Sequence, residues 1–599
     1  MGKGKFSLLP AAPARFTPFI LRHPLMGQFS SAHRLGRGNR VYNAGRLGEP
    51  KEMPRKQMSA TCYLVSVLLT GALCFLCCSC GGGSFKSEPP PPPPSTDFAL
   101  VVSPSLLPIT LGTNGPPALI SVESGNGFSG AVTVSIKGLP EGSTSSPASP
   151  FTIGPNGSQE VRFSVPGATA IGSATIQFSA TSGSLSKQAS LAIDIRPAPE
   201  IRTYQDGETL YIEADSGTEA ARVGMLTTWG GAIVEISLNG TNYVNHNDTG
   251  RQVQVGLWDG NANYSNGSWG WSMSQGGDHY LNGSPLLEQT IGTNFVYIKT
   301  QPLYWLPDLF GGDSAHPIPG DVYVEQWVSP VPAYSRAFKV HYKITHFGSD
   351  MHANQPQEFP SVYVNRGFDS FVYYPGFLPW TYGALQHYSM PPLPQISPLL
   401  PTFEQWGAYA DVNEMGLTVY TPGSYPYSTG FNATGDSPEG TNDFAPFTVF
   451  SWYPNAVLES DIYVVAGPVA EARPVIYQLH DDDSNPSAFP PWGVFEVPQS
   501  GQTVSGSKVE VAGWSFGTSQ IMSLDVFLDG VEVGTATYGS PRPDIPKAYP
   551  GIADLNSGFQ YTLDSTKYTS GGHDLVVKVK DAIGNVAVFP TAHITISNP

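Results

Sequence analysis

The fold is decided by two short stretches, DVYVEQW at residues 321–327 and FKVHYKI at residues 338–344. Each alternates apolar and polar residues, which is the pattern of a β-strand with one buried face. Together they predict a hairpin whose buried face is made of Val322, Val324, Phe338, Val340, Tyr342 and Ile344. The opposite face then carries Tyr323, Glu325, Trp327, Lys339, His341 and Lys343.

That opposite face combines aromatic rings with titratable groups. On a concave sheet it would form a floor for sugar rings, because Trp and Tyr stack on them while polar groups bind the hydroxyls. On a convex sheet the same residues would be ordinary cross-strand charge pairs. Both interpretations stay open, and Tyr323, Glu325, Trp327 and His341 are candidate substrate-binding residues under the first.

The composition extends the strand pattern to the whole chain. The chain has 599 residues, with 65 Gly, 56 Pro, 40% hydrophobic residues and 13% charged residues. Frequent Gly and Pro favour short strands and turns over long helices, and this length predicts several domains. We therefore expect an all-β protein, with a large central β-sandwich flanked by two smaller immunoglobulin-like β-sandwiches.

The two flanking regions are residues 97–197 and 488–599. The first alternates in segments such as AVTVSI at 131–136, and the second in segments such as VEVAGW at 509–514. Turn residues separate the segments at the spacing of a sandwich. The phrases GFSG at 127–130 and DAIGN at 581–585 resemble bacterial immunoglobulin-like modules, which implies spacer domains.

An export signal precedes these regions. Residues 63–78 are sixteen uncharged residues, YLVSVLLTGALCFLCC, with Lys51, Arg55 and Lys56 before them. This pattern predicts a signal peptide over 53–80, after a leader at 1–52 that is disordered or reflects an upstream start site. The run is short for a membrane span, but a stop-transfer anchor remains the alternative.

The cysteines indicate how the exported chain is attached. All five lie between Cys62 and Cys80, so no disulfide can form within residues 81–599. Cys80, followed by a Gly/Ser/Pro linker at 81–96, resembles the acylated cysteine of bacterial lipoproteins, although Cys77 and Cys78 stay open. We expect an extracytoplasmic protein held to a membrane by a lipid anchor, at the cell surface or in the periplasm, or otherwise secreted.

The charge argues against nucleic acid as a partner. Residues 1–60 carry a net charge of +9, from eleven Lys/Arg and two Asp/Glu. Since the whole chain has a net charge of −17, residues 61–599 carry −26. Nucleic acids and anionic membranes bind proteins through basic patches, and the acidic sequence of residues 61–599 shows no basic stripe.

Residues 200–482 are the functional candidate. They hold nine of the eleven Trp and eight of the twelve His. Their opening, LTTWGGAIVEISLNG at 226–240, resembles the start of galactose-mutarotase-like domains, which are large β-sandwiches of carbohydrate-active proteins. Large aromatic residues also fill the cores of ordinary β-sandwiches, so the alternative for each Trp is that it is a core residue.

The segment ITHFGSDMHANQPQEFP at 344–360 is the densest group of polar residues, and we expect it to form a loop. Its His346 and Glu358 are candidate catalytic residues, since a His with a carboxylate can transfer protons near neutral pH. The family resemblance adds Arg251 and His279 as the arginine and second histidine around the sugar, with Glu358 or Glu404 as the carboxylate. His352 and Trp406 complete the candidate substrate-binding set.

No metal or cofactor is expected. His346 and His352 lack the tight spacing of zinc signatures, and nothing supports a calcium site. We therefore expect a protein that binds a poly- or oligosaccharide through its central sandwich. As an enzyme it would be of glycosidase, polysaccharide lyase or sugar epimerase type, and the alternative is a non-catalytic glycan-binding or adhesion protein.

Overall fold

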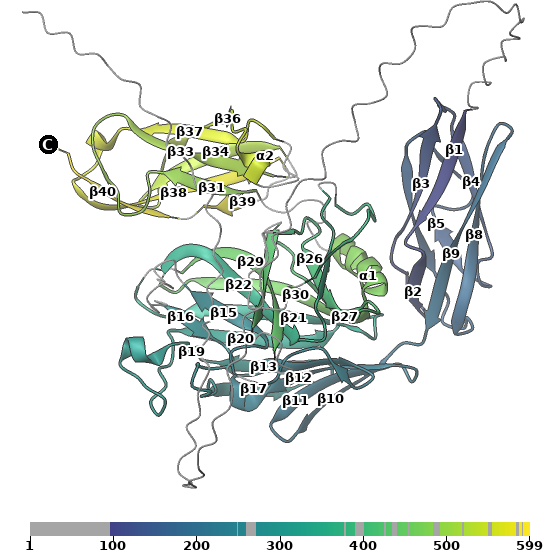
Figure 1. Cartoon of the computed structure of the whole chain (residues 1–599), viewed down its shortest axis with the longest axis horizontal. Coiled ribbons are helices and arrows are strands. Elements are labelled where there is room, and N and C mark those ends of the chain that lie inside the picture. The colour runs from purple at the N-terminus through teal and green to yellow at the C-terminus, as the bar shows by residue number, and fades with distance from the viewer. Residues whose placement is uncertain are drawn as a thin grey trace, which may run out of the picture. The chain divides into compact units, whose positions relative to one another are not determined.

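The computed structural model describes residues 96–598, apart from residues 248, 259–270, 351, 377–378, 390–399, 425–426, 434–439, 453, 483–490, 518–519, 549–553, 583–585 and 590. The predicted leader, signal peptide and lipid-attachment residue Cys80, together with linker residues 81–95, lie outside the described residues. The expected fold class is confirmed, because the described chain is all-β, with its sheets packed in pairs (Figure 1). No described helix is long and apolar enough to cross a membrane.

The first pair of sheets is formed by residues 97–196. Leu107, Val134, Phe163, Phe178 and Ile193 fill the space between the two sheets and are fully buried. One sheet has the order β1 (Asp97–Ser103), β3 (Ala118–Gly125), β7 (Ser158–Ser164), β5 (Thr144–Ser146). The other has the order β2 (Leu106–Thr110), β9 (Leu185–Arg196), β8 (Gly172–Ser182), β4 (Val132–Lys137), β6 (Phe151–Ile153).

The central pair begins with a twelve-stranded sheet. Its main path is β10 (Glu200–Asp206), β11 (Thr209–Asp215), β12 (Ala220–Leu226), β13 (Ala232–Leu238), β15 (Val253–Trp258), β22 (His352–Asn365), β29 (Thr441–Trp452), β28 (Tyr427–Ala433), β25 (Leu400–Pro401). Three short strands extend this sheet: β14 (Thr241–Asn242) pairs with β13, β16 (Ser272–Ser274) pairs with β15, and β19 (Leu303–Tyr304) pairs with β16. The 3-10 turn η1 (Thr227–Trp229) lies between β12 and β13, and η2 (Pro307–Phe310) follows β19.

The second central sheet has nine strands and contains the predicted hairpin. Its order is β17 (Leu286–Ile291), β18 (Val296–Thr300), β20 (Val322–Pro330), β21 (Ala337–His346), β30 (Val457–Pro468), β27 (Met415–Tyr420), β26 (Trp406–Ala410), β23 (Ser370–Tyr373), β24 (Gln386–Ser389). β20 and β21 pair antiparallel with Trp327 opposite His341. The hairpin prediction is therefore confirmed.

The core of the central sandwich lies between these two sheets. It includes all six hydrophobic side chains predicted for the inner face of the hairpin, each fully buried, together with residues such as Ile236 and Trp452 from the other sheet. The polar and aromatic side chains of the hairpin alternate with these and lie on the outward face of the nine-stranded sheet, where they are partly exposed. They are Tyr323, Glu325, Trp327, Lys339, His341 and Lys343.

One helix, α1 (Val469–Asp482), covers part of that outward face. Val469, Ala472, Val475, Ile476 and Leu479 recur at intervals of three and four residues, so they share one face of the helix. That face packs with β26, β27 and β30 around a second core that includes Trp406 and Tyr420. The sequence patterns above do not predict this helix.

The third pair of sheets is formed by residues 492–596, around a core that includes Val511, Val526 and Val577. One sheet has the order β31 (Trp492–Val497), β33 (Val509–Phe516), β37 (Gly558–Leu563), β36 (Thr537–Ser540). The other has β32 (Thr503–Val504), β40 (Ala592–Ile596), β38 (Gly571–Asp581), β34 (Ile521–Leu528), β35 (Val531–Thr535), with β39 (Val586–Val588) paired to β38. Two short helical turns, α2 (Ile545–Ala548) and η3 (Ser565–Lys567), complete it.

Candidate functional site

A row of aromatic rings crosses three strands on the outward face of the nine-stranded sheet. The pairing registers align Tyr297 of β18 with Trp327 of β20, and Trp327 with His341 of β21. The Tyr297 and Trp327 ring centroids are 4.8 Å apart, and those of Trp327 and His341 are 5.3 Å apart. Two strand spacings make the row about 10 Å long. At its end, Asp461 of β30 lies 2.8 Å from His341 Nδ1. We call Tyr297, Trp327 and His341 the aromatic row.

A second row of alternating charges runs beside the aromatic row. Lys299 faces Glu325, Glu325 faces Lys343, and Lys343 faces Glu459 across neighbouring strands. Glu325 also accepts a hydrogen bond of 3.2 Å from the Tyr297 hydroxyl. Burial and the nearby Glu325 carboxylate raise the pKa of Tyr297, so this phenol, already protonated at neutral pH, stays a donor at more alkaline pH than an ordinary tyrosine. The face therefore offers flat apolar surfaces bordered by hydrogen-bonding groups of both charges.

Tyr323, the remaining predicted residue of this face, lies at its other end. Its ring centroid is 4.5 Å from that of Phe347, and Lys299 Nζ lies 5.0 Å from its ring centre. Phe347 is 42% exposed, so this end of the face is open to solvent. Tyr323, Glu325, Trp327 and His341 thus share one sheet face as predicted.

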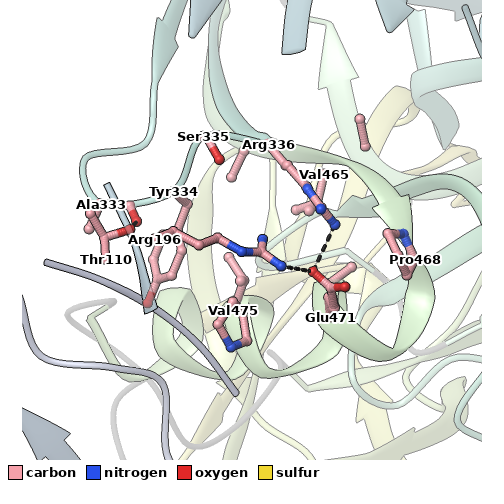
Figure 2. Close-up of a pocket in the computed structure, with 14 residues that line it drawn as sticks. Thr110, Arg196, Ala333, Tyr334, Ser335, Arg336, Val465, Pro468, Glu471 and Val475 are labelled. Atoms are coloured by element: carbon pink, nitrogen blue, oxygen red, sulfur yellow. Dashed lines mark hydrogen bonds and ion pairs between the residues drawn. The ribbon is translucent and has the colours of Figure 1, made fainter. Parts of the chain in front are cut away.

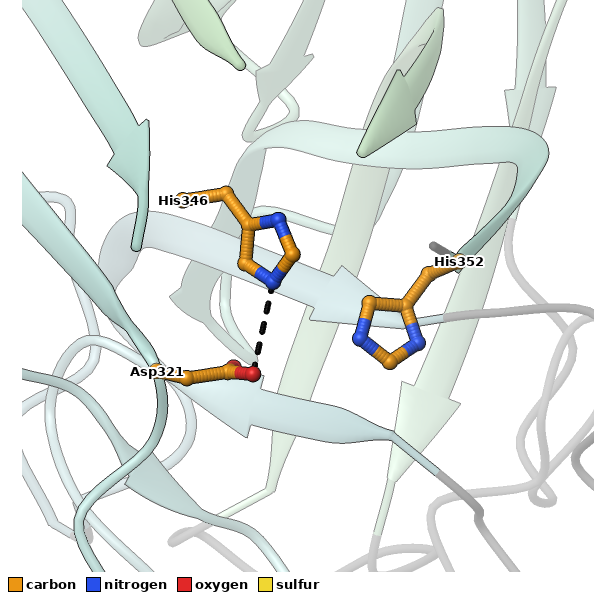
Figure 3. Close-up of side chains that lie close together, drawn as sticks. All are labelled: Asp321, His346 and His352. Atoms are coloured by element: carbon orange, nitrogen blue, oxygen red, sulfur yellow. Dashed lines mark hydrogen bonds and ion pairs between the residues drawn. The ribbon is translucent and has the colours of Figure 1, made fainter. Parts of the chain in front are cut away.

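His346 lies instead in a group with His352 and Asp321 (Figure 3). His346 ends β21 in the nine-stranded sheet, whereas His352 begins β22 in the twelve-stranded sheet. His346 Nε2 is 3.3 Å from Asp321 Oδ2, and one ligand atom from each of the three residues lies within 4.8 Å of the others. His346 is fully buried. Two imidazoles and a carboxylate are a donor set that can hold a divalent transition metal.

Glu358 lies in a different setting from the expected loop. Residues 344–346 end β21 and residues 352–365 form β22, so the prediction of one loop over 344–360 is wrong at both ends, because these segments pair with β20 and β29. Glu358 is buried, and its Oε2 accepts a hydrogen bond of 2.7 Å from Ser361. Burial, followed by the Glu358 charge, raises the pKa of the fully buried Asp443 well above its ordinary value. Glu358 and Asp443 are thus an electrostatically linked pair of buried carboxyl groups.

Arg251 and His279 belong to two loops that meet near Trp305. The backbone N–H of His279 donates to the carbonyl of Trp305, and Thr249 Oγ1 donates to the carbonyl of Asp278. His279 Nε2 lies 3.3 Å from Asp308 Oδ2. The hydroxyl of Tyr280 donates to Asp308 and is the main cause of that carboxyl group's lowered pKa. His279 thus lies beside Asp308, His346 beside Asp321, and Glu358 beside Ser361.

Trp406 is not available for stacking on a sugar. Its side chain is fully buried beneath α1, and its Nε1–H donates to Glu404 Oε2 at 2.8 Å. Arg473 and Tyr477 of α1 donate to the other oxygen of Glu404, at 3.1 and 2.6 Å. The helix that covers this part of the sheet thus makes Trp406 a core residue, and we remove it from the binding set.

The sequence reasoning also missed Asp321 and Asp443. The hairpin register could have indicated Asp321, because pairing Val322 with His346 places Asp321 opposite Phe347, next to His346. No comparable local signal exists for Asp443, which approaches Glu358 only through the pairing of β22 with β29.

A pocket elsewhere is lined by β2 residues, Arg196, residues 333–337 and α1 (Figure 2). Its charges are compensated, since Glu471 Oε2 lies 2.5 Å from Arg196 Nη2 and 2.7 Å from Arg336 Nη1. Glu219 forms a further ion pair with Arg336. Because this network is internally paired, we do not take the pocket as the ligand site.

The solved structures described below are remotely similar to this chain. No family model matches the sequence, and no curated protein matches it. Among solved structures, a polysaccharide lyase is 10% identical, with a TM-score of 0.26 over 66% of this chain and 47% of its own. A GH36 α-galactosidase from Geobacillus stearothermophilus is 7% identical, with a TM-score of 0.30 over 51% and 46%. An I-band fragment of titin is 8% identical, with a TM-score of 0.13 over 84% and 99%.

This chain spans about half the length of each of the two enzymes. Likeness at these TM-scores decides neither fold nor function, so the functional argument rests on the geometry of this chain.

Proposed function

We propose that the central sandwich binds a poly- or oligosaccharide on the outward face of β18, β20, β21 and β30. The observation that carries the proposal is the aromatic row, in which Tyr297, Trp327 and His341 lie side by side on adjacent strands. Sugar rings present apolar C–H faces to such a surface, while their hydroxyls take hydrogen bonds from groups at its border. Glu325 and Asp461 supply acceptors there, and Lys339 supplies a donor.

Ordinary cross-strand pairing also explains part of this face, because Lys339 and Asp461 form an ion pair of 2.6 Å. Partly exposed pairs of this kind contribute only about 0–1 kcal/mol to stability, so they do not account for the adjacent, partly exposed aromatic rings. A surface of rings and paired charges is suited to a neutral or zwitterionic stretch of glycan, with each charged group able to exchange its partner for a hydroxyl.

Binding to a panel of immobilised polysaccharides tests the proposal, with the Trp327→Ala variant beside the wild type. Losing an aromatic anchor should weaken binding by about 2 kcal/mol, roughly thirtyfold in Kd, while the melting temperature changes little. Tyr211→Ala is the matched control, since Tyr211 is also a partly exposed strand residue, with Tyr204 stacked at 5.2 Å and Arg222 at 4.8 Å.

Unchanged binding by Trp327→Ala would reject this face as the binding surface, as would an equal loss in Tyr211→Ala. Assaying the same polysaccharides for cleavage or epimerisation separates the catalytic form of the proposal from the non-catalytic one. Turnover that is lost in Glu358→Gln or His346→Gln, with folding intact, would support an enzyme of glycosidase, lyase or epimerase type. Binding without turnover across the panel would leave a glycan-binding or adhesion protein.

We further propose that the chain works outside the cytoplasm, attached through a lipid on Cys80. The support is the apolar run at 63–78 with its basic flank, and the Gly/Ser/Pro linker that follows Cys80. A stiff proline-rich spacer would hold the first sandwich away from the membrane surface.

A further inference from the structure

We propose that Asp321, His346 and His352 form a binding site for a divalent transition-metal ion, with Zn²⁺ as the preferred ion. The three side chains come from the start of β20, the end of β21 and the start of β22, and Figure 3 shows them directed toward a common space. The proposal concerns the metal alone and does not depend on carbohydrate binding.

The donor set selects the class of ion. Imidazole nitrogens suit Zn²⁺ and other late transition metals, whereas Ca²⁺ and Mg²⁺ prefer shells made of oxygen atoms. Three protein ligands, two of them histidines, leave a fourth tetrahedral position for water or a ligand group. Zn²⁺ stands high in the usual affinity order for such sites and requires no redox chemistry.

The distances are close to those of a coordinated ion. Zn–N and Zn–O bonds of about 2.0–2.1 Å in a tetrahedron place neighbouring ligand atoms about 3.3 Å apart. His346 Nε2 and Asp321 Oδ2 are already 3.3 Å apart. All ligand atoms lie within 4.8 Å of one another, so an inward rotation of the His352 ring would complete the site.

Neighbouring residues hold these ligands in place. The Nε1–H of Trp271 donates to Asp321 Oδ1 at 2.7 Å, which leaves Oδ2 directed at His346. The Trp271 ring also stacks on His352, with centroids 4.0 Å apart and planes 17° apart. Orienting contacts of this kind commonly support metal ligands, since they restrict the positions that the carboxylate and the imidazole plane can take.

Gly348 indicates how closely the backbone surrounds the group. A Cβ at this position would lie 2.2 Å from Asp321 Oδ2 and 2.5 Å from His346 Nε2. A glycine here therefore permits the backbone at residue 348 to pass directly beside the ligand atoms. Because His346 ends a strand of the nine-stranded sheet and His352 begins a strand of the twelve-stranded sheet, a bound ion would link the two sheets at these strand ends.

The experiment uses the full chain, treated with a chelator and then titrated with Zn²⁺ while metal content and melting temperature are measured. We expect one Zn²⁺ per chain and a higher melting temperature, because an ion that binds only the folded state stabilises it. His352→Ala and Asp321→Asn should each weaken binding at least about a hundredfold, and Gly348→Ala should weaken it without removing a ligand. Ca²⁺ should not replace Zn²⁺.

His341→Ala is the matched control. His341 also lies on β21 and contacts a carboxylate, Asp461, at 2.8 Å, but on the outward sheet face. This variant should bind one Zn²⁺ as tightly as the wild type. The proposal is overturned if the wild type takes up no Zn²⁺, if His352→Ala and Asp321→Asn keep full affinity, or if His341→Ala loses the ion instead. Absorption of bound Co²⁺ gives a second measurement, in which a tetrahedral spectrum is expected and an octahedral one counts against the site.

Discussion

The buried Glu404 carboxylate should be one of the most sensitive positions of the central sandwich, and Glu404→Gln tests this. Its Oε1 accepts hydrogen bonds from Arg473 at 3.1 Å, Tyr477 at 2.6 Å and the Trp380 backbone N–H at 3.1 Å. Its Oε2 accepts from Trp406 at 2.8 Å. All four partners are donors. A glutamine amide has one acceptor atom, so in either orientation its NH₂ group faces a donor.

The expected cost follows from burial. Glu404 and Arg473 side chains are 1% and 8% exposed, so the substitution leaves the guanidinium buried without its carboxylate. Breaking a buried pair by removing one partner costs about 3–5 kcal/mol. Arg473 keeps a hydrogen bond of 2.7 Å to the Gly383 carbonyl, which favours the lower part of that range. For a domain of this size, about 3 kcal/mol lowers the melting temperature by roughly 6–12 °C.

Unfolding followed by tryptophan fluorescence measures this cost, because nine of the eleven Trp lie within residues 200–482. The control is Glu414→Gln, the same chemical change at a side chain that is 54% exposed and 3.6 Å from His387. Surface pairs contribute about 0–1 kcal/mol, so this variant should unfold almost like the wild type. A cost below about 1 kcal/mol for Glu404→Gln, or equal costs for the two variants, would refute the reasoning.

Two further predictions concern other parts of the chain. Because burial and the Glu358 charge raise the pKa of Asp443 above its ordinary value of 3.8, the folded state favours the protonated carboxyl group. Its contribution to stability is therefore lost as pH rises from about 4 through the raised pKa. Asp443→Asn should flatten that decline in melting temperature, and parallel pH profiles for the two proteins would contradict this. At the N-terminus, mass spectrometry of the mature protein should find a lipid-modified Cys80, whereas an unmodified chain that retains residues 1–60 would reject both export and anchoring.

Local sequence pattern predicted the hairpin and the side chains on each of its faces. The β-strand period of two depends only on neighbouring residues, so alternation alone separates Val322 and Val324 from Tyr323 and Trp327. The same argument, with abundant Gly and Pro, predicted the all-β class. It could not decide whether the polar face of a strand remains exposed, because a distant segment can cover it. Trp406 is the example, since α1 lies more than 60 residues later and buries it.

The candidate site depended still more on tertiary structure. His346 and His352 are close in sequence, yet they lie on different sheets, and Asp321 joins them only because β20 pairs with β21. Glu358 and Asp443 interact because β22 and β29 pair across 85 positions. By itself the sequence determined strand character and the alternation of faces, which are local properties of the backbone. The packing of sheets and helix decided which polar groups meet and which aromatic rings remain exposed, because those contacts join residues that no short-range pattern connects.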